Sequence, residues 1–401
     1  MKHKNVRYGS LLVTTALLLA PFSLRANEIF YKSVGNTNTF TATVSGTGNR
    51  IGTDAVNQSY GIDHDFSYNT PLNSSTAVVD LARSYTIVTY DESKQIGNLN
   101  TATVDQNGNT NKLSFTQGSQ GGVAFDYNFS ANATDGNGGT NDASDFFNAA
   151  GTLLSYLATA SVDEASGNNN ALTVSQLGDD NQMAIYQLGN GNSVSADQAN
   201  NGNLSRINQL GDSDSVIGDQ NGISNAADVL QSDVNYGRLR SANYTQNGDN
   251  NIASIFQGDI DYSGNNAGSQ TATIFQSQGN NNEAAISQVN GPGIAGISLT
   301  GSSNLGFITQ NNSGDGSEAN IVSAGDHNEA YVYQADADGS IATLTQTGNT
   351  NVIELSQLNL TGNATIEQTG DLNTAYVIQT EANLTVDIMQ NGNGGTVNIY
   401  N

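Results

Sequence analysis

The stretch Gln176–Gln220, QLGDDNQMAIYQLGNGNSVSADQANNGNLSRINQLGDSDSVIGDQ, repeats one pattern every eleven residues. Glutamine marks each step, and most of these glutamines are followed two residues later by glycine and five residues later by asparagine. Between that asparagine and the next glutamine, two apolar or small positions alternate with other residues. A short fixed period of this kind is typical of a solenoid, in which each repeat stacks on the next.

Each eleven-residue unit has the composition of a strand followed by a tight turn. From Asn181 to Gln187 the alternation has a period of two, which indicates a strand with one buried face. The four residues before it, Leu177–Asp180, carry turn chemistry, because glycine supplies positive φ and Asp bonds its own backbone. We therefore predict an all-β fold, a β-solenoid of stacked strand-turn-strand rungs with two 11-residue units per rung.

The repeated polar residues are expected to lie inside this solenoid, on the same side of the strand as the apolar ones. A buried amide without a partner would cost about 1–3 kcal/mol. Identical amides stacked on successive rungs can instead form a hydrogen-bonded ladder. The ladder is predicted at Gln95, Gln106, Gln117, Asn170, Gln176, Asn181, Gln187, Asn192, Gln198, Asn203, Gln209, Gln220, Gln246, Asn251, Gln257, Gln346, Asn351, Gln357, Gln368, Asn373, Gln379 and Gln390. The predicted turn glycines are Gly97, Gly108, Gly178, Gly189, Gly211, Gly222, Gly248, Gly348, Gly370 and Gly392.

Residues 1–26 have the features of a secretory signal peptide. Basic residues near the start, among them Lys2 and Arg7, precede the apolar run Leu11–Ala20, which is too short to span a bilayer as a helix. Cleavage is expected after Ala26. Since no later apolar run approaches a membrane span, we expect an exported chain without a transmembrane anchor.

Composition and charge limit the kinds of partner that the chain can bind. The chain has no cysteine and a formal net charge of −25. Residues 1–26 hold four Lys or Arg and no acid, so the mature chain would carry −25 − 4 = −29. Such a chain repels phosphate backbones and its own copies, which disfavours nucleic acid as a partner and slows premature association.

The repeat is not continuous along the chain. Residues 27–94 are interpreted as an irregular or capping region, in which Thr39–Val44 forms one degenerate unit. The first repeats follow at 95–117, and the main solenoid runs over 167–401. Its last unit places Val397, Ile399 and Asn401 on one parity, so that the final rung is expected to be uncapped.

Residues 118–166 interrupt the repeat as an insertion. The first half is rich in Gly, Asn and Asp, which favours a loop. Apolar residues near Ala143–Ala160 recur at helical spacing, from Phe146 to Leu157, and predict a short helix.

No constellation in the sequence favours catalysis or a cofactor. Asp63, His64 and Asp65 indicate a solvated loop rather than zinc ligands. The oxygen-rich acidic turns leave calcium binding as an alternative. Threonines at 39, 41 and 43 form a row like those of ice-binding solenoids, but the row is not expected to recur on successive rungs. Outward aromatics such as Tyr186, Phe256, Phe275 and Tyr333 are interpreted as scattered surface cover. We predict no catalytic, cofactor-binding or metal-binding residues.

The pattern Gln-x-Gly-x-x-Asn-x-Ala-x-x-x-Gln resembles the curlin repeat of bacterial curli fibre subunits. It is complete at Gln95–Gln106 and Gln368–Gln379, and at Gln176–Gln187 with Met in place of Ala. The resemblance implies export through an outer-membrane secretion pore and polymerisation at the cell surface into amyloid fibres of a biofilm matrix. It also implies that the partners are further copies, other curlin-type subunits and a nucleator.

The physics of the fold favours the same role. A solenoid leaves unpaired N–H and C=O groups at its end rungs, which can template another copy, while acids in the turns slow such stacking. We therefore expect a secreted, non-enzymatic structural subunit of curli-like fibres. The alternatives are a monomeric β-solenoid surface adhesin and a nucleator or accessory protein that binds a surface or glycan.

Overall fold

The structure is a computed structural model, and it describes residues 26–52, 58–61, 78–87, 93–118, 123–134, 156–162, 167–232, 239–258, 269–289, 291–311, 316–335, 339–358, 361–380 and 383–400. The chain divides into two compact units. The solenoid unit combines Met1–Gly52, Glu92–Gly118 and Ser166–Asn401, and the insertion unit combines Thr53–Asp91 and Ser119–Ala165.

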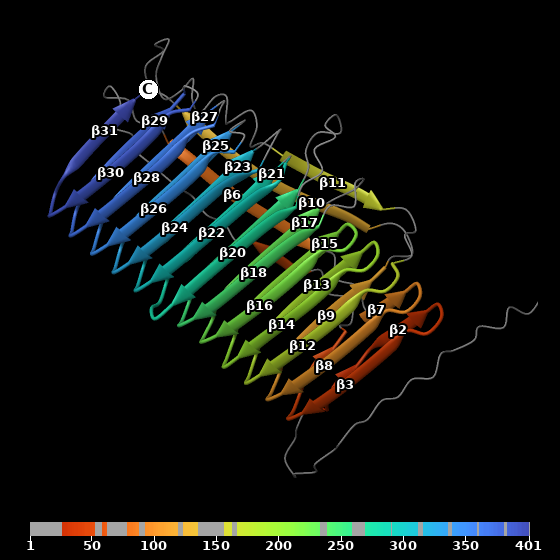
Figure 1. Ribbon diagram of the computed structural model, residues 1–401. Helices are drawn as coiled ribbons and strands as arrows, with labels where there is room; N and C mark the ends of the chain where they lie inside the picture. The colour runs from red at the N-terminus through yellow and green to blue at the C-terminus, as the bar shows by residue number, and fades with distance from the viewer. Residues whose placement is uncertain are drawn as a thin grey trace, which may run out of the picture. The chain divides into compact units, whose positions relative to one another are not determined.

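In the solenoid unit, consecutive strands from β7 onward alternate between two parallel sheets (Figure 1). Sheet A contains β1 (Glu28–Ile29), β2 (Tyr31–Val34), β4 (Arg50–Ile51), β7 (Ser93–Ile96), β9 (Lys112–Gln117), β13 (Gln182–Leu188), β15 (Leu204–Leu210), β17 (Ala226–Ser232), β19 (Ile252–Gly258), β21 (Glu283–Val289), β23 (Leu305–Asn311), β25 (Glu329–Ala335), β27 (Val352–Leu358), β29 (Thr374–Gln379) and β31 (Thr396–Tyr400). Sheet B contains β3 (Thr39–Ser45), β8 (Thr101–Asn107), β12 (Ala171–Leu177), β14 (Ser193–Ala199), β16 (Ser215–Asn221), β18 (Arg240–Asn247), β20 (Gln270–Ser277), β22 (Gly293–Thr300), β24 (Ser317–Ala324), β26 (Ile341–Thr347), β28 (Asn363–Thr369) and β30 (Thr385–Asn391).

One rung is therefore a sheet B strand, a turn and a sheet A strand, so that two units of the repeat build it. Strands that pair are two units apart in the sequence: Gln176 of β12 lies beside Gln198 of β14, and Gln187 of β13 lies beside Gln209 of β15. The predicted all-β solenoid with two units per rung is confirmed.

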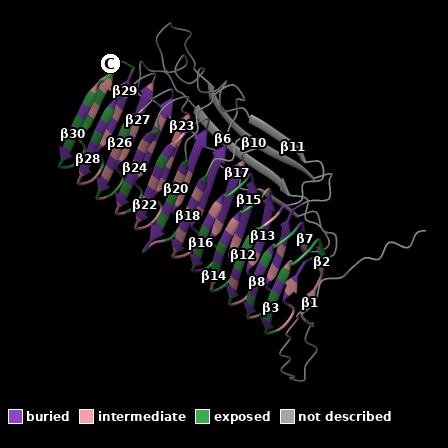
Figure 2. Ribbon diagram, turned by 45° about the vertical axis from the view of Figure 1, so that its right-hand side comes forward, coloured by how far each residue is buried: buried purple, intermediate pink, exposed green. Residues whose placement is uncertain are grey.

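In the strands of sheet B, alternation divides the buried from the more exposed side chains (Figure 2). In the sheet A strands β13, β15, β17 and β19 the outward positions are largely buried as well. In β14, Val194, Ala196 and Gln198 are buried, while Ser195 and Asp197 are exposed. Every second side chain points between the two sheets, which is the consequence of the two-residue period of a strand.

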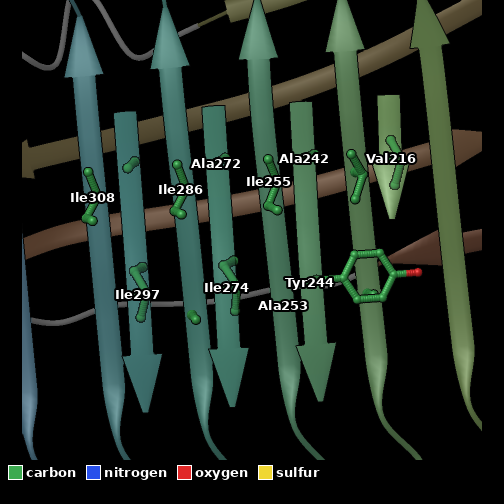
Figure 3. Packing of buried hydrophobic residues seen from close by; sticks show 14 of the residues in the cluster. Val216, Ala242, Tyr244, Ala253, Ile255, Ala272, Ile274, Ile286, Ile297 and Ile308 are labelled. Carbon is green, nitrogen blue, oxygen red and sulfur yellow. The ribbon is translucent and has the colours of Figure 1, made fainter. Parts of the chain in front are cut away.

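Large and small apolar residues interdigitate between the sheets (Figure 3). Ile255 and Ile286 of sheet A lie close to Ala242 and Ala272 of sheet B, and all four are at most 2% exposed. Each buried isoleucine contributes about 2 kcal/mol through the hydrophobic effect. The many small core positions keep the two sheets close to each other.

Tyr244 of β18 places a large ring in this core, at 2% exposure, and neighbouring residues make room for it. The neighbouring strand β16 has Gly218 beside it, and a Cβ on Gly218 would lie 2.1 Å from Tyr244 Cζ. Across the core, Ser205 Oγ lies 2.7 Å from the Tyr244 hydroxyl oxygen. Burial raises the pKa of Tyr244 well above its usual range, so the phenol stays neutral and hydrogen-bonded.

The turns keep neighbouring rungs close through a glycine. Gly348 has φ of 115°, and a Cβ there would lie 2.1 Å from the carbonyl oxygen of Gly370 on the next rung. Two residues after it, Thr350 has φ of 56°, the left-handed region that L residues seldom adopt. The glycine is therefore required both by its backbone angle and by the approach of the next rung.

The first sheet A strands are interrupted by the first insertion. Ile51 of β4 lies beside Leu113, and Gln95 of β7 lies beside Gln117 of the same strand β9. Residues 53–92 thus enter in the middle of one strand of the repeat. The region 27–94, interpreted as irregular, is divided: β1 to β4 pair within the solenoid unit, and Thr53–Asp91 belongs to the insertion unit.

The insertion unit is a four-stranded antiparallel sheet in the order β11 (Tyr156–Val162), β10 (Val123–Thr134), β6 (Val78–Ile87) and β5 (Gln58–Gly61). β10 pairs with both β6 and β11, so that the two insertions together form one sheet. The helix predicted near Ala143–Ala160 is wrong for 156–160, which belong to β11; residues 143–155 lie outside the described ones. The described segments contain no helix, and so none that could cross a membrane.

The threonine row does recur on neighbouring rungs, contrary to the expectation from sequence. Thr41 lies beside Thr103, and Thr103 lies beside Thr173. Adjacent units belong to different sheets, and the insertions separate these three strands in the sequence, so the recurrence is visible only in the fold.

The turn glycines supply a test of the stacking. Gly348→Ala should destabilise the protein by on the order of 3 kcal/mol, because the added Cβ would overlap the carbonyl of Gly370. Gly202→Ala is the matched control: Gly202 also has positive φ, but its nearest neighbour to an added Cβ, Ser224 Oγ, is 3.6 Å away, so only about 1 kcal/mol should be lost. Urea denaturation followed by circular dichroism measures both, and equal losses would contradict the steric account.

Candidate functional site

The inner edge of sheet A carries an unbroken column of glutamine side chains. Each Nε2 donates to Oε1 of the glutamine on the next rung, at 2.7–3.0 Å. All of these amides are buried. The sheet A column consists of Gln95, Gln117, Gln187, Gln209, Gln231, Gln257, Gln288, Gln310, Gln334, Gln357 and Gln379.

The second hydrogen of each amide closes the rung. Gln187 Nε2 also donates to the carbonyl oxygen of Ala171 at 3.1 Å, and Ala171 begins the facing strand of sheet B. Gln209 repeats this contact with Ser193 at 3.1 Å. The glutamine therefore joins its own rung across the two sheets and joins the next rung along the stack, which satisfies both donors of the amide.

Sheet B has a glutamine column of its own, but it is interrupted. Gln106, Gln176, Gln198, Gln220, Gln246 and Gln276 are linked in the same direction, at 2.8–3.0 Å. Leu299 and Ser323 occupy the next two rungs. Ser323 Oγ then donates to Gln346 Oε1 at 2.8 Å, and the column resumes through Gln368 to Gln390.

The two columns begin differently at the first rungs. In sheet A, the Tyr31 hydroxyl donates to Gln95 Oε1 and so takes the place of a preceding glutamine. In sheet B, Val44 lies beside Gln106, and the buried Oε1 of Gln106 has no hydrogen-bond partner among the described residues.

Asparagine forms a third column, at the turns from sheet B to sheet A. Each Oδ1 accepts the backbone N–H of the equivalent residue on the next rung, at 2.9–3.0 Å. The column ends at the N–H of Gly395. Its members are Asn27, Asn49, Asn111, Asn181, Asn203, Asn225, Asn251, Asn282, Asn304, Asn328, Asn351 and Asn373.

The corresponding column at the other turns, from sheet A to sheet B, stops halfway. Asn100, Asn170 and Asn192 are linked in the same manner, and Asn192 Oδ1 accepts the N–H of Asp214. The next position is Arg240, whose Nη1 lies 3.8 Å from Asp214 Oδ1 with both side chains fully buried. A buried ion pair thus stands where the amides end.

An outer row of Asn and Asp at the sheet B to sheet A turns bonds in the opposite direction. Asp371 Oδ1 accepts the N–H of Asn349 on the preceding rung at 2.8 Å, and Asn349 Oδ1 accepts that of Asp326 at 2.9 Å. The acids in this row, Asp179, Asp249, Asp326 and Asp371, never occupy adjacent rungs. This spacing avoids the repulsion that like charges directly opposite each other would cause.

The structure places the predicted ladder residues in these columns and the predicted turn glycines between them. It adds members that the predicted ladder did not name, among them Asn111, Asn225, Gln231 and Gln288. It also adds Asn49, where the insertion at 53–92 hides the spacing to Gln95. It also adds Phe307 and Tyr331, whose rings stack 5.8 Å apart across two rungs. Tyr186 and Phe256, interpreted as surface cover, are 7% and 5% exposed.

No cation site stands out in the described segments, where His, Asp and Glu do not gather in groups of three. His327 lies in a turn at φ of 57°, and Asp63, His64 and Asp65 lie outside the described residues. The chemistry that the columns offer is hydrogen bonding between like amides along one axis.

The amide column can be tested by one buried substitution. Gln209→Leu removes the partner of Gln187 Nε2 and of Gln231 Oε1, both buried, and should cost about 2–4 kcal/mol. Ser195→Leu, at an exposed position of β14 in sheet B, controls for the added leucine and should cost less than about 0.5 kcal/mol. Chemical denaturation compares the two, and an unchanged midpoint for Gln209→Leu would mean that the column contributes nothing.

A second test concerns Asp197 and Asp219, which lie side by side on the exposed face of sheet B. Burial raises the pKa of both carboxyls, and for Asp219 the charge of Asp197 adds to the shift. Because the folded state then binds protons more tightly than the unfolded state, this pair lowers stability as pH rises. Asp219→Asn should therefore stabilise by a few tenths of a kcal/mol near pH 7, a gain limited by solvent screening, and by nothing near pH 3.

Thermal unfolding from about pH 3 to 7 measures the effect. Asp105→Asn is the control, because Asp105 lies in the same column between the uncharged Thr43 and Ser175. A stabilisation by Asp219→Asn that does not change with pH would contradict the repulsion.

Comparison with known proteins bears on the repeat itself. Residues 167–199 match the family model of the curlin associated repeat, a span that covers β12, β13 and β14. No curated protein matches the chain. Residues 167–199 therefore carry a curlin associated repeat, and the glutamine columns in which this span takes part continue on both sides of it.

Proposed function

We propose that this protein is a secreted structural subunit of extracellular curli-like amyloid fibres, which assembles by in-register stacking of its rungs. The observation that carries the proposal is the sheet A column, in which eleven glutamines from Gln95 to Gln379 bond without interruption. Such a ladder of like amides in parallel strands is the arrangement that stabilises cross-β assemblies.

The charge and the leader of the chain support export before assembly. The mature chain would carry −25 − 4 = −29, which keeps copies apart while they are dilute. The proposal includes removal of residues 1–26 as a signal peptide, export through an outer-membrane pore and nucleation by another curlin-type subunit. The proposal also includes localisation at the cell surface in a biofilm matrix, which the curlin associated repeat at residues 167–199 supports.

The proposal is non-enzymatic. Two observations support a non-enzymatic role. The curlin associated repeat occurs in structural subunits, and the amide side chains of the columns bond one rung to the next. The glutamines and asparagines of the columns bond to their equivalents on neighbouring rungs, so these side chains are engaged in stacking the rungs.

Purified residues 27–401 provide the test. At micromolar concentration the protein should bind an amyloid dye after a lag and give fibre diffraction near about 4.8 Å and 10 Å. Fragments of the product should shorten the lag when they are added as seeds, because an end rung templates the next copy. A protein that stays monomeric for weeks, with or without seeds, would refute the fibre proposal.

A second candidate is a monomeric adhesin or accessory protein that binds a glycan. What favours it is the stacked pair of Phe307 and Tyr331 on the outward side of sheet A, with Tyr333 on the same strand as Tyr331. Ring faces of this kind bind apolar surfaces, including those of sugars. Monomeric protein that binds matrix glycans, and loses that binding in Tyr331→Ala, would support this candidate.

A further inference from the structure

Four exposed apolar side chains gather on the outward face of sheet B. Phe275, Ile294, Val322 and Ile341 are 41%, 53%, 44% and 43% exposed. They come from β20, β22, β24 and β26, which are consecutive strands of the sheet. Several exposed apolar side chains on one sheet face indicate an interaction surface, because such a face is otherwise a liability.

The register sets these four residues at the corners of one area, which we call the sheet B patch. Phe275 and Val322 lie in the same column two strands apart, with Ser298 between them. Ile294 and Ile341 lie in a second column two strands apart, with Glu318 between them. The two columns stand four residues apart along the strands, about 13 Å.

The remaining outward positions of the patch are nearly free of charge. Most are Thr or Ser, and the single acid among them is Glu318. Its Oε1 accepts a hydrogen bond from Asn320 Nδ2 at 2.9 Å. The patch therefore combines apolar corners with short hydroxyl side chains, a composition that packs sheet against sheet.

We propose that the sheet B patch docks against the same patch of a second copy, so that neighbouring fibres associate side by side. This inference rests on the proposed function. The chain has a net charge of −25 and contains no lysine or arginine from residue 241 onward, so acids elsewhere on this half have no cation on a second copy's equivalent half to pair with. Two patches, in contrast, meet with little repulsion.

The charge of the patch also selects the occupant. A cationic or an anionic partner would find almost no charge to recognise there, since Glu318 is already bonded to Asn320. A flat β-sheet face of matching composition, packed at about 10 Å, satisfies the apolar corners and leaves Glu318, bonded to Asn320, as the one charge that the contact must accommodate. A second copy supplies that face.

The area of the sheet B patch indicates that stable docking between copies requires their prior assembly into fibres. Four strands of seven or eight residues cover about 20 × 25 Å, or about 500 Å² per copy. A stable dimer needs about 800 Å² per partner, so two single copies should not hold together. Copies fixed along a fibre repeat the patch at regular intervals, and the weak contacts then act together.

The test compares two lysine pairs on the same face. Ile294→Lys with Ile341→Lys charges the sheet B patch, whereas Leu177→Lys with Ile217→Lys charges β12 and β16, outside it, at positions that are 42% and 57% exposed. Dye binding measures fibre mass, and electron microscopy with low-speed sedimentation measures the bundled fraction. At equal fibre mass, the patch pair should lower the bundled fraction at least tenfold, and the control pair should leave it near that of the unmodified protein.

Cysteine cross-linking gives a second readout, because the chain contains no cysteine. Ser298→Cys places a thiol within the patch, and Ser195→Cys places one on the same face outside it. Within one fibre, equivalent residues lie a whole solenoid apart, beyond the reach of a disulfide. Oxidised fibres of Ser298→Cys should therefore contain covalent dimers between fibres, and those of Ser195→Cys should not.

Each remaining outcome decides against the proposal or is resolved by the second readout. Bundling that survives the patch pair, or Ser298→Cys fibres without dimers, would overturn it. If the patch pair prevents fibre formation, the Ser298→Cys dimers decide, since that variant keeps the patch. Patch variants that bundle normally but lose adsorption to lipid vesicles would identify a different occupant. Unmodified protein that forms no fibres would refute the proposed function itself, a result distinct from unbundled fibres.

Discussion

The hydrogen bond between a buried side-chain amide and the same amide on the next rung is the constraint on which this structure depends. Gln187 donates to Gln209 and, with its second hydrogen, to the backbone of Ala171, so that one side chain fixes both the stack and the closure of the rung. A shift of the register would leave these donors unpaired in the core. The turn glycines keep the rungs close enough for this hydrogen bond, because a Cβ at Gly348 would push neighbouring rungs apart.

Much of the fold could be predicted from the sequence, because the period of eleven records the geometry directly. Alternation gave the strands, Gly and Asn gave the turns, and the equal spacing of Gln176 to Gln220 implied that like residues stack. Features that arise from contacts between distant segments could not be predicted in this way. The roles of Gly218 and Ser205 in accommodating Tyr244, for example, depend on contacts that only the fold creates.

The insertions account for the other differences. Asn49 and Gln95 belong to one strand of the repeat, but residues 53–92 separate them, so a search along the chain finds no unit there. The apolar spacing near 143–160 suggested a helix, because such spacing is a local signal. β11 pairs instead with β10, a partner that the periodicity of its own sequence cannot reveal.

The two edges of the solenoid unit differ, and the difference has a consequence for how the chain tolerates change. Four residues separate the strands at each sheet B to sheet A turn except the one between Ser277 and Glu283, which has five. The asparagine column runs along this edge without a break. The opposite edge accepts connections of very different length, including the 53 residues between Gln117 and Ala171. Additional residues can therefore be inserted at the sheet A to sheet B connections of many rungs, while the sheet B to sheet A turns keep the same length.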